Sequence, residues 1–244
     1  AAYADFTEAC TTTCFIAWDW DNHHWLDLST FLAAHSDFYA PAHHENLYLL
    51  SRFNWLSMGP VYCTTEQWPR KFLSDNLDQI LLAQRSDAPL GMHIPHQRFN
   101  FRMQIVATLN KHYSSIGFSG PEFHNRTRED RFREWHSHKT HWITPVLNDV
   151  PIRVFDALIT GGIPIVPDSM RFLPPISIIP REYVAFYSAA DIVNPESVVA
   201  YANGLFDRAG REGIVARHRY AIENSHGDIS IRQILQYSSE HLKC

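Results

Sequence analysis

Two kinds of apolar pattern alternate along this chain. Short runs of apolar residues are typical of buried strands, whereas apolar residues that recur every three or four positions are typical of amphipathic helices. In the first third of the chain the pattern predicts strands at 14–21, 36–42 and 59–66, and helices at 25–35, 44–56 and 72–85. The order is strand, helix, strand throughout, which indicates crossover connections between parallel strands.

The same alternation restarts after "QRSDAPLG" (84–91). It predicts strands at 89–96, 114–120, 140–146, 163–166 and 183–188, with helices at 99–113, 127–139 and 150–160 and helical segments from Asn194 to the end. The predicted fold class is therefore α/β, with Rossmann-like parallel sheets and flanking helices. We place a domain boundary near residue 86.

The two predicted domains differ in size. Residues 1–86 form a partial, acceptor-side Rossmann-like domain, and residues 87–244 form a Rossmann-like domain able to bind a nucleotide sugar. In such sheets ligands lie beyond the carboxyl ends of the strands, next to helix N-termini. Residues that follow strands are therefore the first candidates for a site.

Composition excludes several classes of protein. The chain has 244 residues, of which 45% are hydrophobic, and a net charge of -5, which gives no electrostatic footprint for nucleic acid. No apolar run reaches the roughly 20 residues that cross a bilayer. We expect a cytoplasmic protein, with peripheral membrane association still open.

Cysteine and histidine content suggests no dedicated metal or disulfide framework. The four cysteines are scattered, and we interpret them as ordinary thiols in a reducing compartment. Among 15 histidines, "HSHKTH" (136–141) offers two ligands from one strand face, but nothing obvious supplies the others. We predict no metal site, and a His-rich metallohydrolase stays as an alternative.

The segment "VPIRVFDALITGGIPIVPD" (150–168) contains the most informative candidate functional residues. Asp149 and Pro151 are suited to a helix start, and Gly161 and Gly162 to its end. An apolar stripe is expected to contain Ile152, Phe155 and Ile159, with Arg153 and Asp156 off that stripe.

Two interpretations of Arg153 and Asp156 follow from their chemistry. They form either a surface ion pair three residues apart, or a clamp on a nucleotide. In the clamp, Arg153 holds phosphate oxygens through its forked guanidinium and Asp156 accepts hydrogen bonds from ribose hydroxyls.

A resemblance favours the clamp. The segment 137–168 resembles the donor-binding segment of GT-B glycosyltransferases, especially the exostosin-like group, in which a Ser-Lys pair before a strand leads to an R-x-F-D/E-A-x-x-x-G/C-x-I-P-V run. The matching elements are Ser137, Lys139, Pro145, Arg153, Phe155, Asp156, Ala157, Gly162, Ile163 and Pro164. The Glu of the retaining pattern is replaced by Asn148, so the stereochemistry stays open.

The resemblance implies a metal-independent transferase with no resident cofactor. Its partners are a nucleotide-sugar donor and a saccharide or glycoconjugate acceptor, as in the synthesis of surface polysaccharides. Basic side chains would neutralise the nucleotide phosphate as the glycosidic bond breaks. The implied donor-binding residues are His93, Arg98, Arg102, Lys139, Arg153, Asp156, Gly161 and Gly162.

The acceptor side rests on "WDWDNHHW" (18–25), which ends a predicted strand. An inverting transferase needs a general base, and Asp19, Asp21 and His23 are the candidate catalytic residues. The first domain is short for a full GT-B arrangement. A non-catalytic module that only binds a nucleotide sugar therefore remains a second alternative.

Overall fold

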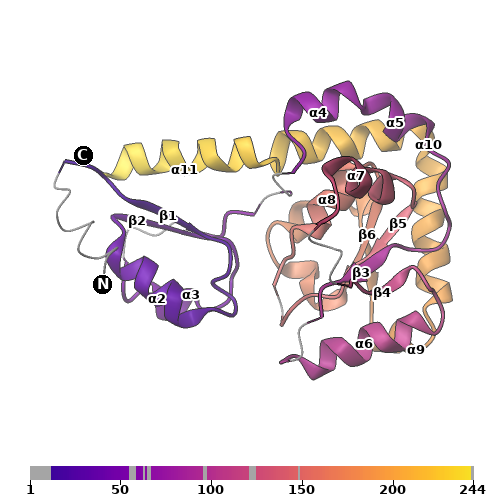
Figure 1. The fold of residues 1–244 in the computed structure, drawn as a ribbon, viewed down its shortest axis with the longest axis horizontal. Helices are drawn as coiled ribbons and strands as arrows, with labels where there is room; N and C mark the ends of the chain where they lie inside the picture. Colours follow the sequence, from indigo (N-terminus) through magenta and orange to yellow (C-terminus); the bar gives the residue numbers. More distant parts are fainter. Residues whose placement is uncertain are drawn as a thin grey trace. The chain divides into compact units, whose positions relative to one another are not determined.

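The computed structural model describes residues 12–54, 59–62, 64, 67–95, 98–120, 125–147 and 149–242. It is a mixed α/β protein with small parallel sheets, as the α/β part of the prediction requires (Figure 1). The chain divides into two compact units: unit 1 comprises residues 1–63 and 227–244, and unit 2 comprises 64–226. The boundary predicted near residue 86 falls inside unit 2.

Unit 1 is built on two parallel strands joined through a helix. The register runs from Ile16 opposite Phe38 to Asp19 opposite Pro41. Its elements are β1 (Ile16–Asp19), α2 (Leu26–His35), β2 (Phe38–Pro41), α3 (Leu47–Leu50) and α11 (Gly227–His241).

Both faces of this two-stranded sheet are covered. Because successive side chains of a strand point to opposite faces, each strand contributes to two clusters. The first cluster contains Ala17, Ala33, Tyr39 and Leu50 and packs on α2 and α3. The second contains Phe38, Ala40, Val61 and Ile234 and packs on α11.

Two predictions for unit 1 are wrong. The described residues 59–62 and 64 form no strand, although Val61 still reaches the core and its N–H donates to the Pro41 carbonyl at 2.8 Å. The helix predicted at 44–56 is reduced to α3 among its described residues, and Asn46 before it adopts a left-handed φ of 64°. An apolar residue that returns to a core as irregular chain gives the same sequence signal as a strand.

Cys14 also differs from expectation, because it is disulfide-bonded. The interpretation of the cysteines as ordinary thiols is therefore wrong for this residue. The other three cysteines lie outside the described residues.

Unit 2 contains the longer parallel sheet. Its elements are α4 (Arg70–Asp75), α5 (Leu77–Leu82), β3 (Gly91–His93), α6 (Asn100–Asn110), β4 (Ile116–Phe118), α7 (Arg128–His136), β5 (Thr140–Trp142), α8 (Arg153–Ile159), β6 (Ile163–Pro167), the 3-10 helices η2 (Asp168–Phe172), η3 (Ile176–Ile178) and η4 (Arg181–Tyr183), β7 (Ala185–Tyr187), α9 (Ala189–Val193) and α10 (Glu196–Asn224). The five strands predicted in this part of the chain all form, and each is short.

The strand order of unit 2 is β4-β3-β5-β6-β7. β3 pairs with β4, and β5, β6 and β7 pair in that order. A parallel bridge between Leu90 and His141 connects the two sets, with the Trp142 N–H donating to the Leu90 carbonyl at 2.8 Å. The chain therefore moves outward from β3 to β4 and then in the other direction from β5 onward.

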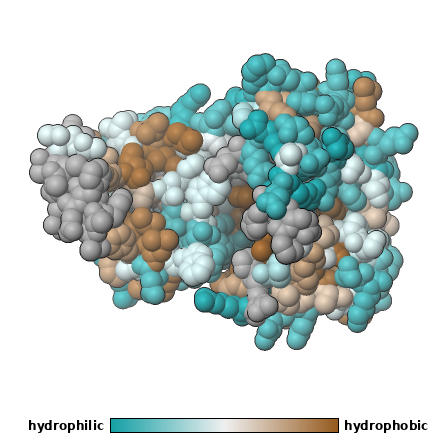
Figure 2. Space-filling model, in the orientation of Figure 1, coloured by the Kyte–Doolittle hydropathy of each residue, from teal (hydrophilic) through white to brown (hydrophobic). Residues whose placement is uncertain are grey.

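Helices α8 and α10 pack against β6. α10 is interrupted at Gly210, whose φ is 53° and ψ is -150°. The helix predicted at 72–85 is divided into α4 and α5 at Asn76. Hydrophilic side chains gather over α4, α5 and α7, as expected for the outer faces of helices (Figure 2). In the part of the chain that the structure describes, every helix is too short or too polar to traverse a bilayer.

Helix α8 departs from its predicted start. It begins at Arg153, no side chain caps it, and Ile152 keeps 36% of its surface exposed. Asp156 is instead buried, with 4% of its surface exposed. The interpretation of Arg153 and Asp156 as an ion pair on an open surface is therefore wrong.

The end of α8 is fixed by cationic and imidazole side chains. Arg85 donates to the Thr160 carbonyl at 2.8 Å, and Arg217 donates to the Gly161 carbonyl at 2.9 Å. His218 donates to the Ile159 carbonyl. Donors at a helix C-terminus satisfy carbonyls that have no partner within the helix.

Candidate functional site

The strand order of unit 2 locates the place where a ligand is expected. In an open parallel sheet, ligands bind outside the carboxyl ends of the strands where the order reverses. That point lies between β3 and β5, the strands joined by the Leu90–His141 bridge. Two cavities lie among the residues around these strand ends.

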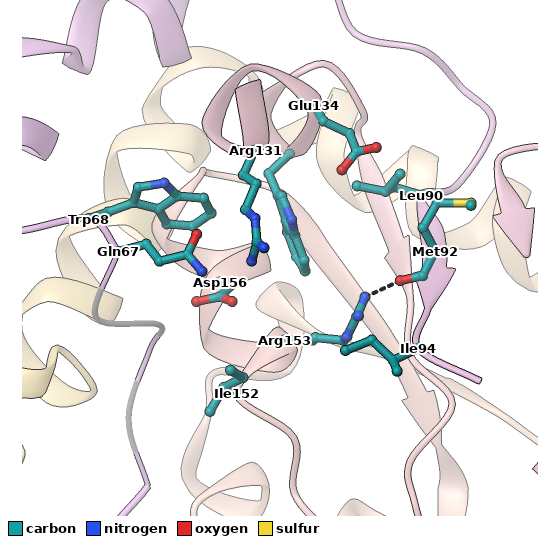
Figure 3. A pocket seen from close by; sticks show the side chains of 11 residues that line it. Gln67, Trp68, Leu90, Met92, Ile94, Arg131, Glu134, Ile152, Arg153 and Asp156 are labelled. Atoms are coloured by element: carbon teal, nitrogen blue, oxygen red, sulfur yellow. Dashed lines mark hydrogen bonds between the residues drawn. The ribbon is translucent and has the colours of Figure 1, made fainter. Parts of the chain in front are cut away.

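The first, which we call the Arg153 cavity, has a volume of about 230 Å³. Figure 3 shows its side chains, which come from the segment before α4, from β3 and from the helices α7 and α8. It is lined by Gln67, Trp68, Leu90, Met92, Ile94, Arg131, Glu134, Trp135, Ile152, Arg153 and Asp156. Arg153 and Asp156, predicted from the sequence to form a nucleotide clamp, thus share one cavity.

Arg153 is held at the end of β3. Its Nη1 donates to the Met92 carbonyl, drawn as a dashed line in Figure 3. Burial, and then the charge of Arg102, lower the pKa of Arg153 to about 10, while Asp156 acts in the opposite direction. The guanidinium therefore stays charged at neutral pH, and an anion in this cavity would relieve its repulsion with Arg102.

Arg131 extends from α7 toward the Asp156 carboxylate (Figure 3). Burial lowers the pKa of Arg131, and the nearby Glu134 and Asp156 carboxylates raise it. Glu134 is itself paired with Arg126 at 2.9 Å. The cavity therefore brings together two guanidinium groups, Arg131 and Arg153, and two carboxylates, Glu134 and Asp156.

Two indole rings complete the wall of the Arg153 cavity. Trp68 donates through Nε1 to the Arg128 carbonyl at 3.3 Å, which fixes its ring. Trp135 stacks on His141 with ring centroids 4.7 Å apart and an interplanar angle of 12°. Aromatic faces of this kind are suited to stacking against a base or a sugar ring.

The second, the carboxyl-edge cavity, is larger, with a volume of about 590 Å³. It is lined by the start of α6, by the residues that follow β5, β6 and β7, and by α9, including Phe99, Asn100, Phe101, Arg102, Thr144, Pro145, Asp168, Ser169, Tyr187 and Ser188. Arg102 is anchored there: Nε donates to the Thr144 carbonyl at 3.1 Å and Nη1 to the Ile94 carbonyl at 2.7 Å.

His93 is held by backbone groups at both of its ring nitrogens. It is fully buried, Nδ1 donates to the Gly91 carbonyl at 2.5 Å, and Nε2 accepts from the Thr144 N–H at 3.1 Å. Burial, followed by the charges of Arg153 and Arg102, lowers its pKa well below the usual range. Both nitrogens of the neutral ring are thus occupied by backbone groups that connect β3 to the end of β5.

Three other predicted donor-binding residues lie at the amino edge of the sheet, because Lys139 precedes β5 and both Gly161 and Gly162 precede β6. Lys139 forms ion pairs with Asp87 at 2.6 Å and Asp207 at 2.8 Å. The two glycines form the turn after α8. This edge is opposite to the one where ligands are expected, so their geometry fits a structural role. Arg98 is exposed in the loop that leads into α6.

The predicted catalytic residues belong to unit 1, at the carboxyl end of β1. Asp19 is buried and accepts hydrogen bonds from the Tyr39 hydroxyl at 2.7 Å and from the Asp21 N–H at 3.0 Å. Asp21 is exposed, and His23 is buried. That one of the three is a general base stays a prediction.

Sequence reasoning missed Arg131, Trp68 and Glu134. Arg131 and Trp135 are four residues apart on α7, a spacing that places two side chains on one helix face. That spacing was the available signal. Trp68 gave no sequence signal of a site, because a lone tryptophan before a helix is most often part of a core.

Comparison with known proteins adds no assignment. No protein-family model matches this chain, and no curated protein matches it either.

Proposed function

We propose that this protein is a glycosyltransferase, and that unit 2 binds the nucleotide part of a nucleotide-sugar donor. One observation carries the proposal. Arg131, Arg153 and Asp156, contributed by two different helices, line one cavity beside the point where the strand order reverses. This is where the resemblance of residues 137–168 to GT-B donor-binding segments leads one to expect the phosphates.

The charges in the cavity are suited to the leaving group. Breaking the bond between a sugar and a nucleotide leaves negative charge on the terminal phosphate, and fixed guanidinium groups stabilise that charge most when they are shielded from water. Arg131 and Arg153 supply two such groups. Asp156 supplies an acceptor for ribose hydroxyls, and Trp68 or Trp135 supplies a stacking surface.

The size of the cavity limits which part of the donor it holds. Pockets that enclose whole drug-sized ligands occupy about 300–1,000 Å³. A volume of about 230 Å³ is below that range, so the Arg153 cavity would hold the phosphates and an adjoining ring. The proposal requires no resident cofactor.

Unit 1 would supply the acceptor side in a GT-B-like arrangement with a shortened N-terminal part. Its parallel β1-α2-β2 element supports this part of the proposal. The acceptor would be a saccharide or glycoconjugate, with surface polysaccharide synthesis as the setting.

The disulfide of Cys14 bears on the compartment. Structural disulfides persist in oxidising environments and are rare in the cytosol. We therefore favour an oxidising compartment for this activity over the cytoplasm that the cysteine pattern suggested.

Calorimetric titration with UDP, GDP and CMP tests donor binding. We expect one nucleotide to bind, and Arg131→Ala to weaken that binding at least tenfold because a charge-assisted contact to phosphate is lost. Arg133→Ala is the matched control: it lies on the same helix, is exposed and pairs with Asp130 at 3.4 Å. It should bind as the wild type does.

Three outcomes have distinct meanings. Binding of none of the three nucleotides by folded protein contradicts the proposal. Binding unaffected by Arg131→Ala but blocked by Ser169→Trp would move the donor to the carboxyl-edge cavity. Nucleotide binding without release of free sugar or nucleotide from any bound nucleotide sugar would identify a binding module that is not an enzyme.

A further inference from the structure

Two loops at the carboxyl ends of β1 and β2 in unit 1 are held together by hydrogen bonds. Asn22 is fully buried and connects them. Its Nδ2 donates to the His43 carbonyl at 2.9 Å and to the Glu45 carbonyl at 2.7 Å, and its Oδ1 accepts from the His43 N–H at 2.9 Å. Asn46 adds a bond to the Asn22 carbonyl at 2.7 Å. The side chains on these loops are therefore held in place.

Three imidazole rings meet between the loops. His24 Nδ1 lies 2.7 Å from His23 Nε2, so a single proton is shared between these nitrogens. The rings of His23 and His43 have centroids 4.2 Å apart. His23 therefore contacts both of the other rings.

A carboxylate belongs to the same cluster. One ligand atom each of Asp21, His23 and His24 lie within 4.8 Å of one another, and Asp21 Oδ1 is 3.8 Å from His24 Nε2. Asp21 is exposed, which leaves the cluster open to solvent on that side.

His43 packs against His23 from the second loop and is itself fixed in orientation. Its Nε2 donates to the Trp20 carbonyl at 3.0 Å, so the lone pair is on Nδ1. That Nδ1 is buried and, among the described residues, accepts no hydrogen bond. The second loop thus supplies a rigid wall beside the His23 ring.

We infer that Asp21, His23 and His24 bind a divalent transition-metal ion of the zinc type, with the buried His43 ring packed against His23. Imidazole and carboxylate together are a common ligand set for such an ion. On binding, the proton between His23 and His24 moves to the other nitrogen of its own ring, and both lone pairs turn to the metal. Zn–N bonds of about 2.0–2.1 Å in a tetrahedral site require the two nitrogens to separate to about 3.3 Å.

The inference is independent of the proposed function. It concerns unit 1, and it replaces the prediction that the chain has no metal site with a specific ligand set. It also changes the role of His23: a ring that gives its lone pair to a metal cannot act as a general base.

Zinc titration of the whole 244-residue chain, after treatment with a chelator, tests the inference. We expect the wild type to bind one ion per chain with a dissociation constant in the micromolar range or below. Asp21→Asn and His24→Gln should each weaken this site at least tenfold. His35→Gln, at the other end of α2, is the matched control and should retain it, which separates the site from adventitious binding by the remaining histidines.

Cobalt provides a second readout. Co²⁺ bound by nitrogen and oxygen ligands in a tetrahedral site absorbs visible light, and this band should be lost in the two variants. Circular dichroism at matched concentration shows whether each variant is folded. If His24→Gln does not fold, the zinc affinity of Asp21→Asn alone tests the inference, because Asp21 is exposed and its substitution should not affect folding. Equal zinc affinity in wild type and folded Asp21→Asn, or no ion bound by the wild type, overturns the inference.

Discussion

Gly161→Ala tests whether the turn after α8 is structural. Gly161 has a φ of +77°, where a residue with a Cβ atom is strained by about 1–2 kcal/mol. The added Cβ would also lie 2.5 Å from Cγ2 of Ile214, and overpacking of this kind costs about 1–3 kcal/mol. Alanine also restricts the conformations of the unfolded chain, which offsets about 0.4–1 kcal/mol of this destabilisation. We expect a net destabilisation of about 2–4 kcal/mol.

Two companion variants separate these contributions. Gly162→Ala meets only a steric obstacle, His141 Nε2 at 2.5 Å, and should cost less than Gly161→Ala. Gly227→Ala has nothing within 4 Å of the added Cβ and should change stability little. Urea denaturation gives the free energies of unfolding, with an unchanged m-value as the check that the same transition is measured.

The same variants test the role assigned from sequence. Because both glycines lie at the amino edge of the sheet, the affinity of folded protein for a nucleotide should stay within about threefold of wild type, a change under 1 kcal/mol. Destabilisation of Gly161→Ala by less than about 1 kcal/mol would refute the packing argument. A large loss of nucleotide affinity in folded Gly162→Ala would restore the donor-binding role.

Three further predictions concern buried and paired side chains. Burial lowers the pKa of His136 from 6.5 to about 4, so the stability that the neutral ring contributes is present above pH 6.5 and is lost as the pH falls toward 4. Between these pH values, the free energy of unfolding measured in urea should fall more steeply for the wild type than for His136→Gln, by about 1.4 kcal/mol per pH unit. Equal slopes for the two proteins would contradict this. Peptide mapping of unreduced, alkylated protein should show Cys14 without the alkyl label, and quantitative labelling of Cys14 would show that it is a thiol. Lys139→Met removes ion pairs with the exposed Asp87 and Asp207, so nucleotide titration should give wild-type affinity; a tenfold loss would return Lys139 to the donor site.

Several local features could be predicted from the sequence because their causes are local. Alternating apolar runs gave the α/β class and the strands of unit 2, since burial of β-branched runs does not depend on the exact neighbours. The turn at Gly161 and Gly162 was likewise expected, because only glycine adopts that backbone without strain. The short helix α3 and the irregular chain around Val61 were missed, since a residue can reach a core without regular structure.

The site was predicted only in part. Arg153 and Asp156 were identified from their spacing, whereas Arg131 was not, because its relation to Asp156 spans 25 positions of sequence. His93 and Lys139 had the right chemistry for phosphate. Their partners, the Thr144 N–H and two aspartates, occupy them, and such partners appear only when the strands are placed side by side.

The sequence by itself determined which residues can carry charge, bind a metal or permit a turn, and where strands and helices alternate. Tertiary structure decided which of those residues share an edge of a sheet. The physical reason is that the parallel pairing of whole strands places Lys139 and the two glycines together at the amino edge, away from Arg153 and Arg131. It also brings His23, His24 and His43 together from loops twenty residues apart.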